Sequence, residues 1–180
     1  MIGNQTLPGP KFPYRDESMA VVYAPMDRIF AYLDEHTQLS AHMSESSWKL
    51  GWGRMVVQLD EARGQALGSR IRLSGRVFGL QLSVEEVVSE RDPPHRKFWE
   101  TIGTPRLLVI GQYRMGFELS RLAQGSLLRV SIDYALPANA PARWLGRALG
   151  PYYARWCTQK MVDDAVGHFA TLDASEASRP

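Results

Sequence analysis

The sequence predicts an α+β fold in which a curved antiparallel sheet wraps around one long C-terminal helix and can enclose an internal cavity. Between residues 55 and 136, several runs of alternating apolar and polar residues indicate half-buried antiparallel strands. From Pro151 on, apolar residues recur at the spacing of one helical face, namely Tyr152, Trp156, Val162, Val166 and Phe169. Because the sheet has one apolar face and the helix one apolar stripe, we expect each to bury the other.

The chain before the sheet predicts one short strand and two short helices. The strand covers residues 19–23. Pro25 then stands at a position suited to the first turn of a helix, which we expect to run from Met26 to Asp34. A second short helix is expected at residues 37–43. Residues 44–53 mix helix breakers with two tryptophans and predict a loop at the rim of the sheet.

Six strands are expected next, separated by turns that contain glycine or proline. They cover residues 55–60, 71–77, 80–92, 95–104, 109–119 and 128–136. In the third of these strands, one side is lined by Leu80, Leu82, Val84 and Val88. The closing helix is expected at residues 141–173. We expect a kink or a break at Gly150-Pro151, because proline lacks the backbone donor that continues a helix.

The composition fits one domain of ordinary hydrophobicity. We expect a single domain at residues 18–173, an N-terminal arm at 1–17 and a frayed tail at 174–180. No window approaches the roughly 18 continuous apolar residues of a membrane span, so stable membrane insertion is not expected. The formal net charge of +2 is small and the arginines are dispersed, which does not favour nucleic-acid binding. A single cysteine and a start without a secretory signal pattern are typical of a cytoplasmic protein.

Three parts of the chain resemble a known protein superfamily, in addition to the order of the expected elements. They are residues 21–25 with 29–34, residues 87–96 at the end of a strand, and Gly125-Ser126 before the last strand. With the order strand, two helices, six strands and helix, they resemble the START-like superfamily. This superfamily is also called SRPBCC or Bet v 1-like, and the likeness is to its polyketide cyclase/dehydrase and lipid-transport branch. The resemblance implies a helix-grip fold with a pocket for lipids, polyketides or other apolar molecules.

One pattern of the family is missing from this chain. Relatives that bind coenzyme Q carry an Asp, Tyr-Pro, Phe-Leu-Pro pattern after the first helix. Here that region reads Asp-Glu-His-Thr-Gln-Leu-Ser at residues 34–40. This departure argues against coenzyme Q as the ligand.

The expected alternation places polar side chains inside the sheet. Glu100 shares one side of its strand with Phe98 and Ile102, so we expect it inside as a proton donor or hydrogen-bond anchor. A shift of one residue in register would instead turn it outward. Tyr113 and Tyr134 are expected on the inner faces of adjacent strands, where their hydroxyl groups contact either a ligand or the backbone.

The remaining candidates are apolar residues and groups near the expected mouth of the cavity. Met115 follows Tyr113 in the inner row, and Trp156 belongs to the helical stripe. His42 and Trp48 are expected near the mouth, where the alternatives are a surface histidine and a tryptophan that packs on the rim. The histidines show no metal-ligand spacing and no dinucleotide or phosphate-loop pattern is present, so we expect neither metal nor cofactor. Cys157 is expected to be an inert buried thiol.

Three functions fit a container of this kind. The first is a protein that binds or carries a small apolar or amphipathic ligand, held by burial of apolar area at about 25 cal/mol per Å². The second is a cyclase/aromatase-type enzyme in which Glu100, Tyr113 or His42 moves protons; it requires at least two inner polar groups that converge on one point. The third is a partner-binding module whose own side chains fill the cavity. The sequence leaves the oligomeric state open.

Overall fold

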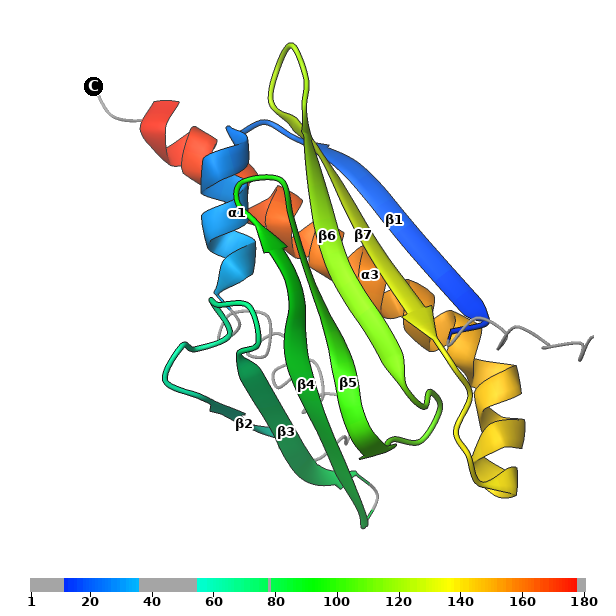
Figure 1. The fold of residues 1–180 in the computed structure, drawn as a ribbon. Coiled ribbons are helices and arrows are strands. Elements are labelled where there is room, and N and C mark those ends of the chain that lie inside the picture. The colour runs from blue at the N-terminus through cyan, green and yellow to red at the C-terminus, as the bar shows by residue number, and fades with distance from the viewer. Residues whose placement is uncertain (1–11, 36–54, 78, 178–180) are drawn as a thin grey trace, which may run out of the picture.

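The computed structural model describes residues 12–35, 55–77 and 79–177, and it has the expected α+β architecture (Figure 1). The strands are β1 (Tyr14–Val22), β2 (Met55–Leu59), β3 (Arg70–Val77), β4 (Leu80–Asp92), β5 (Arg96–Arg106), β6 (Tyr113–Arg121) and β7 (Ser126–Tyr134). They form one antiparallel sheet in the order β1-β7-β6-β5-β4-β3-β2. The described helices are α1 (Met26–Asp34) and α3 (Ala140–Ala177), and α3 packs mainly against β1 and β7. Neither helix is long and apolar enough to span a membrane.

The strand register defines which side chains share the face of the sheet that the helices cover. Residues directly opposite each other in antiparallel strands lie on the same face. The pairs Val88 with Trp99, Trp99 with Met115, and Met115 with Ile132 therefore trace one row across four strands. We call the face that carries this row the inner face.

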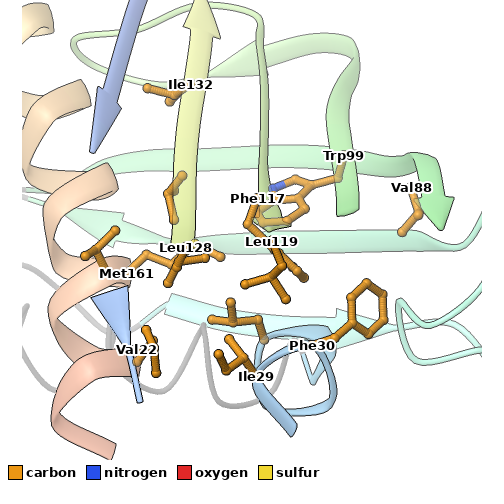
Figure 2. Packing of buried hydrophobic residues seen from close by; sticks show 14 of the residues in the cluster. Val22, Ile29, Phe30, Val88, Trp99, Phe117, Leu119, Leu128, Ile132 and Met161 are labelled. Carbon is orange, nitrogen blue, oxygen red and sulfur yellow. The ribbon is translucent and has the colours of Figure 1, made fainter. Parts of the chain in front are cut away.

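The hydrophobic core lies between the inner face and the two helices (Figure 2). Phe117 and Leu128 of the sheet and Ile29 of α1 are fully buried, and Met161 of α3 closes the same cluster. Each large apolar side chain that is buried in this way stabilises the fold by roughly 1.5–3 kcal/mol. The sequence prediction that sheet and C-terminal helix cover each other is confirmed.

The helix α3 starts at a side-chain cap and passes through a proline. Oδ1 of Asn139 accepts a hydrogen bond from the backbone N–H of Ala142 at 3.0 Å, which satisfies one of the free donors of the first turn. We expected a kink or a break at Pro151; the helix continues through this residue, so it does not break there. Gly146 allows a close approach to the connection between β5 and β6, because a Cβ atom there would lie 2.6 Å from the carbonyl oxygen of Val109.

Several expected boundaries differ from the observed ones. The first strand begins at Tyr14 and not at residue 19, and Tyr14 pairs with Tyr134. The expected arm at residues 1–17 therefore extended four residues too far. The strand expected at residues 109–119 begins at Tyr113. The second helix expected at residues 37–43 and the loop at 44–53 lie outside the described residues.

Candidate functional site

Glu86 lies in the middle of β4 with its side chain on the inner face. Its neighbours in the same row are Val84 and Val88, and only 5% of Glu86 is exposed. Burial penalises the charged carboxylate and raises the pKa of Glu86 from 4.5 to about 7, while a hydrogen bond from Tyr113 opposes the rise. The carboxyl group is therefore close to its titration midpoint at neutral pH.

Tyr113 of β6 reaches Glu86 across the intervening strand β5. Its hydroxyl group donates a hydrogen bond to Oε1 of Glu86. The backbone N–H of Tyr113 donates to Oγ1 of Thr101 at 3.1 Å, and Thr101 Oγ1 lies 3.4 Å from the carbonyl oxygen of Tyr113. Thr101 thus holds Tyr113 at the point where the regular pairing of β5 with β6 ends. Burial and the nearby Glu86 raise the pKa of Tyr113 well above 10, so the phenol stays a donor.

Tyr153 and Cys157 approach the same point from α3. They are four residues apart, which places them on one side of the helix, and both are half-buried. Burial raises the pKa of Cys157 to about 12, and the pKa of Tyr153 rises well above 10 because of Cys157 and burial. Glu86, Tyr113, Tyr153 and Cys157 interact electrostatically with one another. We call these four residues the Glu86 cluster.

The Glu86 cluster can exchange protons and hydrogen bonds with a small molecule. The two phenols and the thiol hold their protons at neutral pH, because the pKa of each is raised. Glu86 alone titrates near neutrality, so it can either accept or donate a proton. A thiol whose pKa is raised is a poor nucleophile, which argues against covalent chemistry at Cys157.

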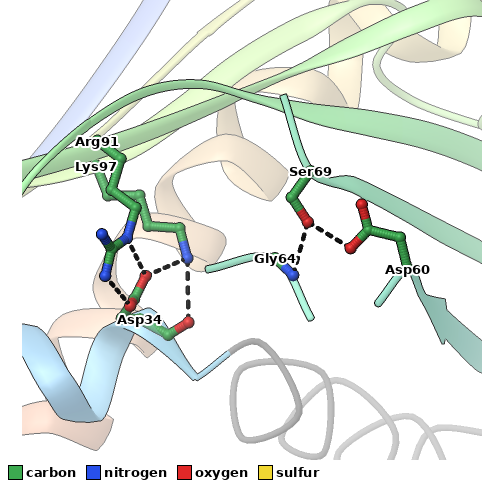
Figure 3. A network of polar contacts seen from close by, with 6 residues as sticks. All are labelled: Asp34, Asp60, Gly64, Ser69, Arg91 and Lys97. Atoms are coloured by element: carbon green, nitrogen blue, oxygen red, sulfur yellow. Dashed lines mark hydrogen bonds and ion pairs between the residues drawn. The ribbon is translucent and has the colours of Figure 1, made fainter. Parts of the chain in front are cut away.

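A second buried polar group, centred on Asp34, holds the end of α1 on the sheet (Figure 3). Nζ of Lys97 donates to the Asp34 carboxylate at 2.7 Å and to its carbonyl oxygen at 3.0 Å. Arg91 donates to both carboxylate oxygens, at 3.2 and 2.7 Å. Burial alone would raise the pKa of Asp34, but the hydrogen bonds and charges of Arg91 and Lys97 hold it below its usual value. Because both cations are directed at one carboxylate, we assign this group a structural role.

An open surface pocket of about 380 Å³ lies between the start of α1 and the turn from β6 to β7. It is lined by residues 23–27 together with Arg121, Gly125 and Ser126. No member of the Glu86 cluster lines it, so it is separate from the candidate site. The internal cavity expected from the sequence stays a prediction.

Comparison with known structures places this arrangement among proteins of one fold. Norcoclaurine synthase from Thalictrum flavum, in complex with dopamine and hydroxybenzaldehyde, aligns with a TM-score of 0.59 at 14% identity, over 88% of this chain and 86% of its own. Ara h 8.0201 aligns with a TM-score of 0.57 at 14% identity, over 88% of this chain and 98% of its own. The chain has a Bet v 1-like fold. The resemblance to the START-like superfamily is therefore confirmed at the level of the fold.

A third protein of the Bet v 1-like fold is the major latex-like protein 151 from Panax ginseng. It aligns with a TM-score of 0.52 at 12% identity, over 87% of this chain and 97% of its own. No protein-family model matches the chain, and no curated protein matches its sequence. At these identities the likeness extends to the fold and not to the ligand or the reaction.

Three of the predicted site residues lie on the inner face of the Bet v 1-like sheet. Tyr113 belongs to the Glu86 cluster. Met115 is half-buried and packs against the core. Tyr134 is buried and stacks on Tyr14, with ring centroids 5.4 Å apart. The structure therefore brings Tyr113 to Glu86 and leaves Tyr134 with an aromatic partner on the edge strand β1.

The predicted inward position of Glu100 is wrong. Glu100 lies opposite Arg114 in the register of β5 and β6, and both are on the outer face. Trp99 and Thr101, on either side of Glu100, are buried on the inner face. The sequence predicted the wrong side because Phe98, which shares one side of the strand with Glu100, is apolar and was expected to face the core. In the structure, the guanidinium group of Arg114 covers the Phe98 ring on the outer face, at 4.2 Å from its centroid.

The predicted helix face is partly wrong. Phe169 is buried, but Trp156 is 38% exposed and its ring lies beside Tyr153. The positions that face the sheet near Trp156 are occupied by the fully buried small residues Ala154 and Thr158. The two remaining candidates, His42 and Trp48, lie outside the described residues.

Sequence reasoning missed Glu86, Tyr153 and Cys157 as members of the site. The signal for Glu86 was present, because it occupies the row of Leu82, Val84 and Val88 at the same two-residue spacing. A carboxylate in an apolar row is the pattern expected of a buried, functional or paired group. Tyr153 and Cys157 carried no such signal, because the face of α3 was assigned from its largest side chains.

The observed helix face gives a direct test. Trp156→Ala should lower the free energy of unfolding by less than the roughly 3–5 kcal/mol expected for a fully buried tryptophan, because 38% of the residue is exposed. Ala154→Leu should destabilise by about 1–3 kcal/mol, because the added atoms must enter the packed contact with the sheet. Urea denaturation followed by circular dichroism measures both variants. A loss of about 3–5 kcal/mol for Trp156→Ala, together with no loss for Ala154→Leu, would contradict this assignment of the face.

Proposed function

We propose that this chain binds a small, largely apolar molecule between the inner face of the sheet and α3, and that the Glu86 cluster holds the polar group of that molecule. The observation that supports this proposal best is the meeting of four hydrogen-bonding side chains from β4, β6 and α3 within an apolar surrounding. Pockets for small molecules typically combine apolar walls with a few convergent polar groups. Lipid-like and polyketide-like molecules with a hydroxyl or carbonyl group have the matching chemistry.

The cluster is suited to a neutral or hydroxylated polar end. Tyr113 and Tyr153 stay protonated and offer O–H donors to a carbonyl oxygen, and Glu86 offers an acceptor to a hydroxyl group. A permanently anionic ligand is disfavoured, because a carboxylate brought beside Glu86 would repel it and no cation belongs to the cluster. The proposal therefore favours alcohols, phenols and ketones over fatty acid anions.

A matched pair of probes tests this preference. The protein should bind 2-naphthol about ten-fold more tightly than naphthalene, because only the former has a hydroxyl group for Glu86. Glu86→Gln and Tyr113→Phe should reduce this preference, whereas Glu100→Gln, which changes the same chemical group on the outer face, should leave it intact. Fluorescence titration measures the affinities, and native mass spectrometry of freshly purified protein searches for a bound natural ligand. Equal affinity for both probes, or a preference that survives in Glu86→Gln, would refute the role of the cluster.

A second function, an acid–base enzyme of the cyclase/aromatase type, is favoured by one specific observation. The pKa of Glu86 near 7 is suited to proton transfer at neutral pH, and Tyr113 supplies a second polar group at the same point. Incubation with poly-β-ketone substrates, followed by product analysis, separates the two functions. Conversion that is lost in Glu86→Gln and has an inflection near pH 7 would establish the enzyme. Binding without conversion, in both the parent and the variant, would establish the binding protein.

A further inference from the structure

The first half of α3 presents a row of aromatic side chains that nothing in the described chain covers. Trp144 and Tyr152 are each 75% exposed, and Leu149 is 46% exposed. At about 100° per residue, Trp144, Tyr152 and Trp156 lie within about one third of the circumference of the helix, so they belong to one side of it. Exposed apolar groups that are contiguous in this way usually mark an interaction surface, whereas single ones do not.

The charges beside this row have one sign. No Asp or Glu occurs between residues 134 and 162, while Arg143, Arg147, Arg155 and Lys160 do. Lys160 pairs with Asp164, and Arg143 donates to the backbone carbonyl groups of Pro137 and Ala138. No carboxylate of the described chain pairs with Arg147 or Arg155.

Several arginines on the sheet do have acidic partners. Arg70 and Arg72 both pair with Glu85, and Arg91 pairs with Asp34. The exposed side of α3 between residues 144 and 156 therefore combines uncovered aromatic rings with cations that have no acidic partner in the part of the chain that the structure describes. We call this side, with Trp144, Leu149, Tyr152, Trp156, Arg147 and Arg155, the aromatic face of α3.

We propose that the aromatic face of α3 docks on an anionic lipid surface, with the helix lying along the interface. Tryptophan and tyrosine rings are favoured at the boundary between headgroups and acyl chains, and arginines beside them attract lipid phosphates. Helices that lie in the interface combine an apolar side with flanking cations in this way. The proposal concerns the outer side of α3, so it does not depend on what the Glu86 cluster binds.

The shape and the chemistry of the aromatic face favour lipid over other partners. The face is a convex ridge on a single helix, which matches a flat, deformable surface and offers no groove for a peptide. Figure 1 shows the first turns of α3, coloured yellow, beyond the end of β1 at the edge of the molecule, where the sheet does not obstruct a flat surface. Nucleic acid would require a larger set of free cations, because its affinity arises mainly from phosphate contacts.

Sedimentation with sucrose-loaded vesicles tests the proposal on the full chain. The protein should sediment with vesicles of equal parts phosphatidylcholine and phosphatidylglycerol, sediment little with phosphatidylcholine alone, and dissociate as salt rises. The double variant Trp144→Ala/Tyr152→Ala should weaken binding by about ten-fold or more. Arg147→Gln/Arg155→Gln should weaken it by about five-fold for each arginine. Because all four side chains are exposed, circular dichroism should show that both variants keep the fold.

Matched surface variants supply the controls. Arg76→Gln on β3 and Leu67→Ala in the connection before β3 lie at exposed positions and should bind the vesicles as the parent does. Absence of sedimentation with the anionic vesicles, or equal binding by the aromatic double variant, would overturn the proposal. A dimer in light scattering that the aromatic double variant abolishes, without vesicle binding by the parent, would overturn it in favour of a second copy of the chain. Retention of the parent, but not of the variant, by duplex DNA without vesicle binding would overturn it in favour of nucleic acid.

Discussion

Asp34→Ala should lower the free energy of unfolding by about 3–5 kcal/mol, the cost of leaving a buried cation without its partner. Lys97 is fully buried and donates to both the carboxylate and the carbonyl group of Asp34. Removing the carboxylate takes away the anion that both this ammonium group and the guanidinium group of Arg91 contact. The loss should appear in urea denaturation near neutral pH as a lower midpoint with little change in slope.

Two further variants separate a buried pair from an ordinary salt bridge. Asp133→Ala removes the carboxylate that pairs with exposed Arg15 and should cost about 1 kcal/mol or less. Asp34→Ala/Lys97→Met removes both buried charges and should recover a large part of the stability lost in Asp34→Ala. If the double variant is no more stable than Asp34→Ala, the loss comes from the end of α1 and not from an unpaired Lys97.

The parts of the fold that the sequence predicted well are those with strong local signals. The predicted first helix, Met26–Asp34, has the observed bounds, because Pro25 fixes its start and an apolar stripe follows. The strands β3 and β4 were predicted because their apolar and polar residues alternate and Gly79 turns the chain with a positive φ of 79°. These signals depend only on neighbouring residues, so the sequence alone is enough to read them.

The first part of β1 was missed because its contact with α3 is polar. Asp16 and Ser18 lie on the side of β1 that faces the helix, and both contact the hydroxyl group of Thr158, at 2.7 and 2.8 Å. A search for apolar alternation cannot find such a strand. The same contact misled the reading of α3, because small buried residues such as Ala154 and Thr158 replace the large apolar side chains that were expected at the sheet.

The candidate site was predicted only in part, because some of its contacts join residues of different strands and leave no local pattern in the sequence. Tyr113 was predicted on the inner face because apolar and polar residues alternate regularly in β6 and the ring of Tyr113 is largely apolar. A search for apolar rows does not find Glu86, because a charged residue interrupts such a row. In the structure it is compatible with burial because its pKa rises and Tyr113 donates to it, and both effects require residues from a different strand.

The second large effect is expected in the pH dependence of stability, which Glu86 should dominate between about pH 4.5 and 7. The pKa of Glu86 is about 7 in the folded protein and 4.5 in its unperturbed state, so folding favours the protonated form. The stability from Glu86 is fully present below pH 4.5 and is lost as pH rises through 7, for a total of about 3 kcal/mol. Urea denaturation at intervals across this range measures the loss. Glu86→Gln cannot titrate, so it should lack this loss and gain stability relative to the parent as pH rises.

The partner of Glu86 and the acid range provide the checks on this prediction. Tyr113→Phe removes the hydrogen bond that opposes the rise of the Glu86 pKa, so the loss of stability should extend to higher pH than in the parent. The pKa of Asp34 is held below its usual value of 3.8. The stability that Asp34 contributes is therefore lost only as the pH falls below about 3.8. This loss does not overlap with the effect of Glu86. If the parent and Glu86→Gln lose stability equally between about pH 4.5 and 7, Glu86 is not a buried carboxyl group that folds in its protonated form.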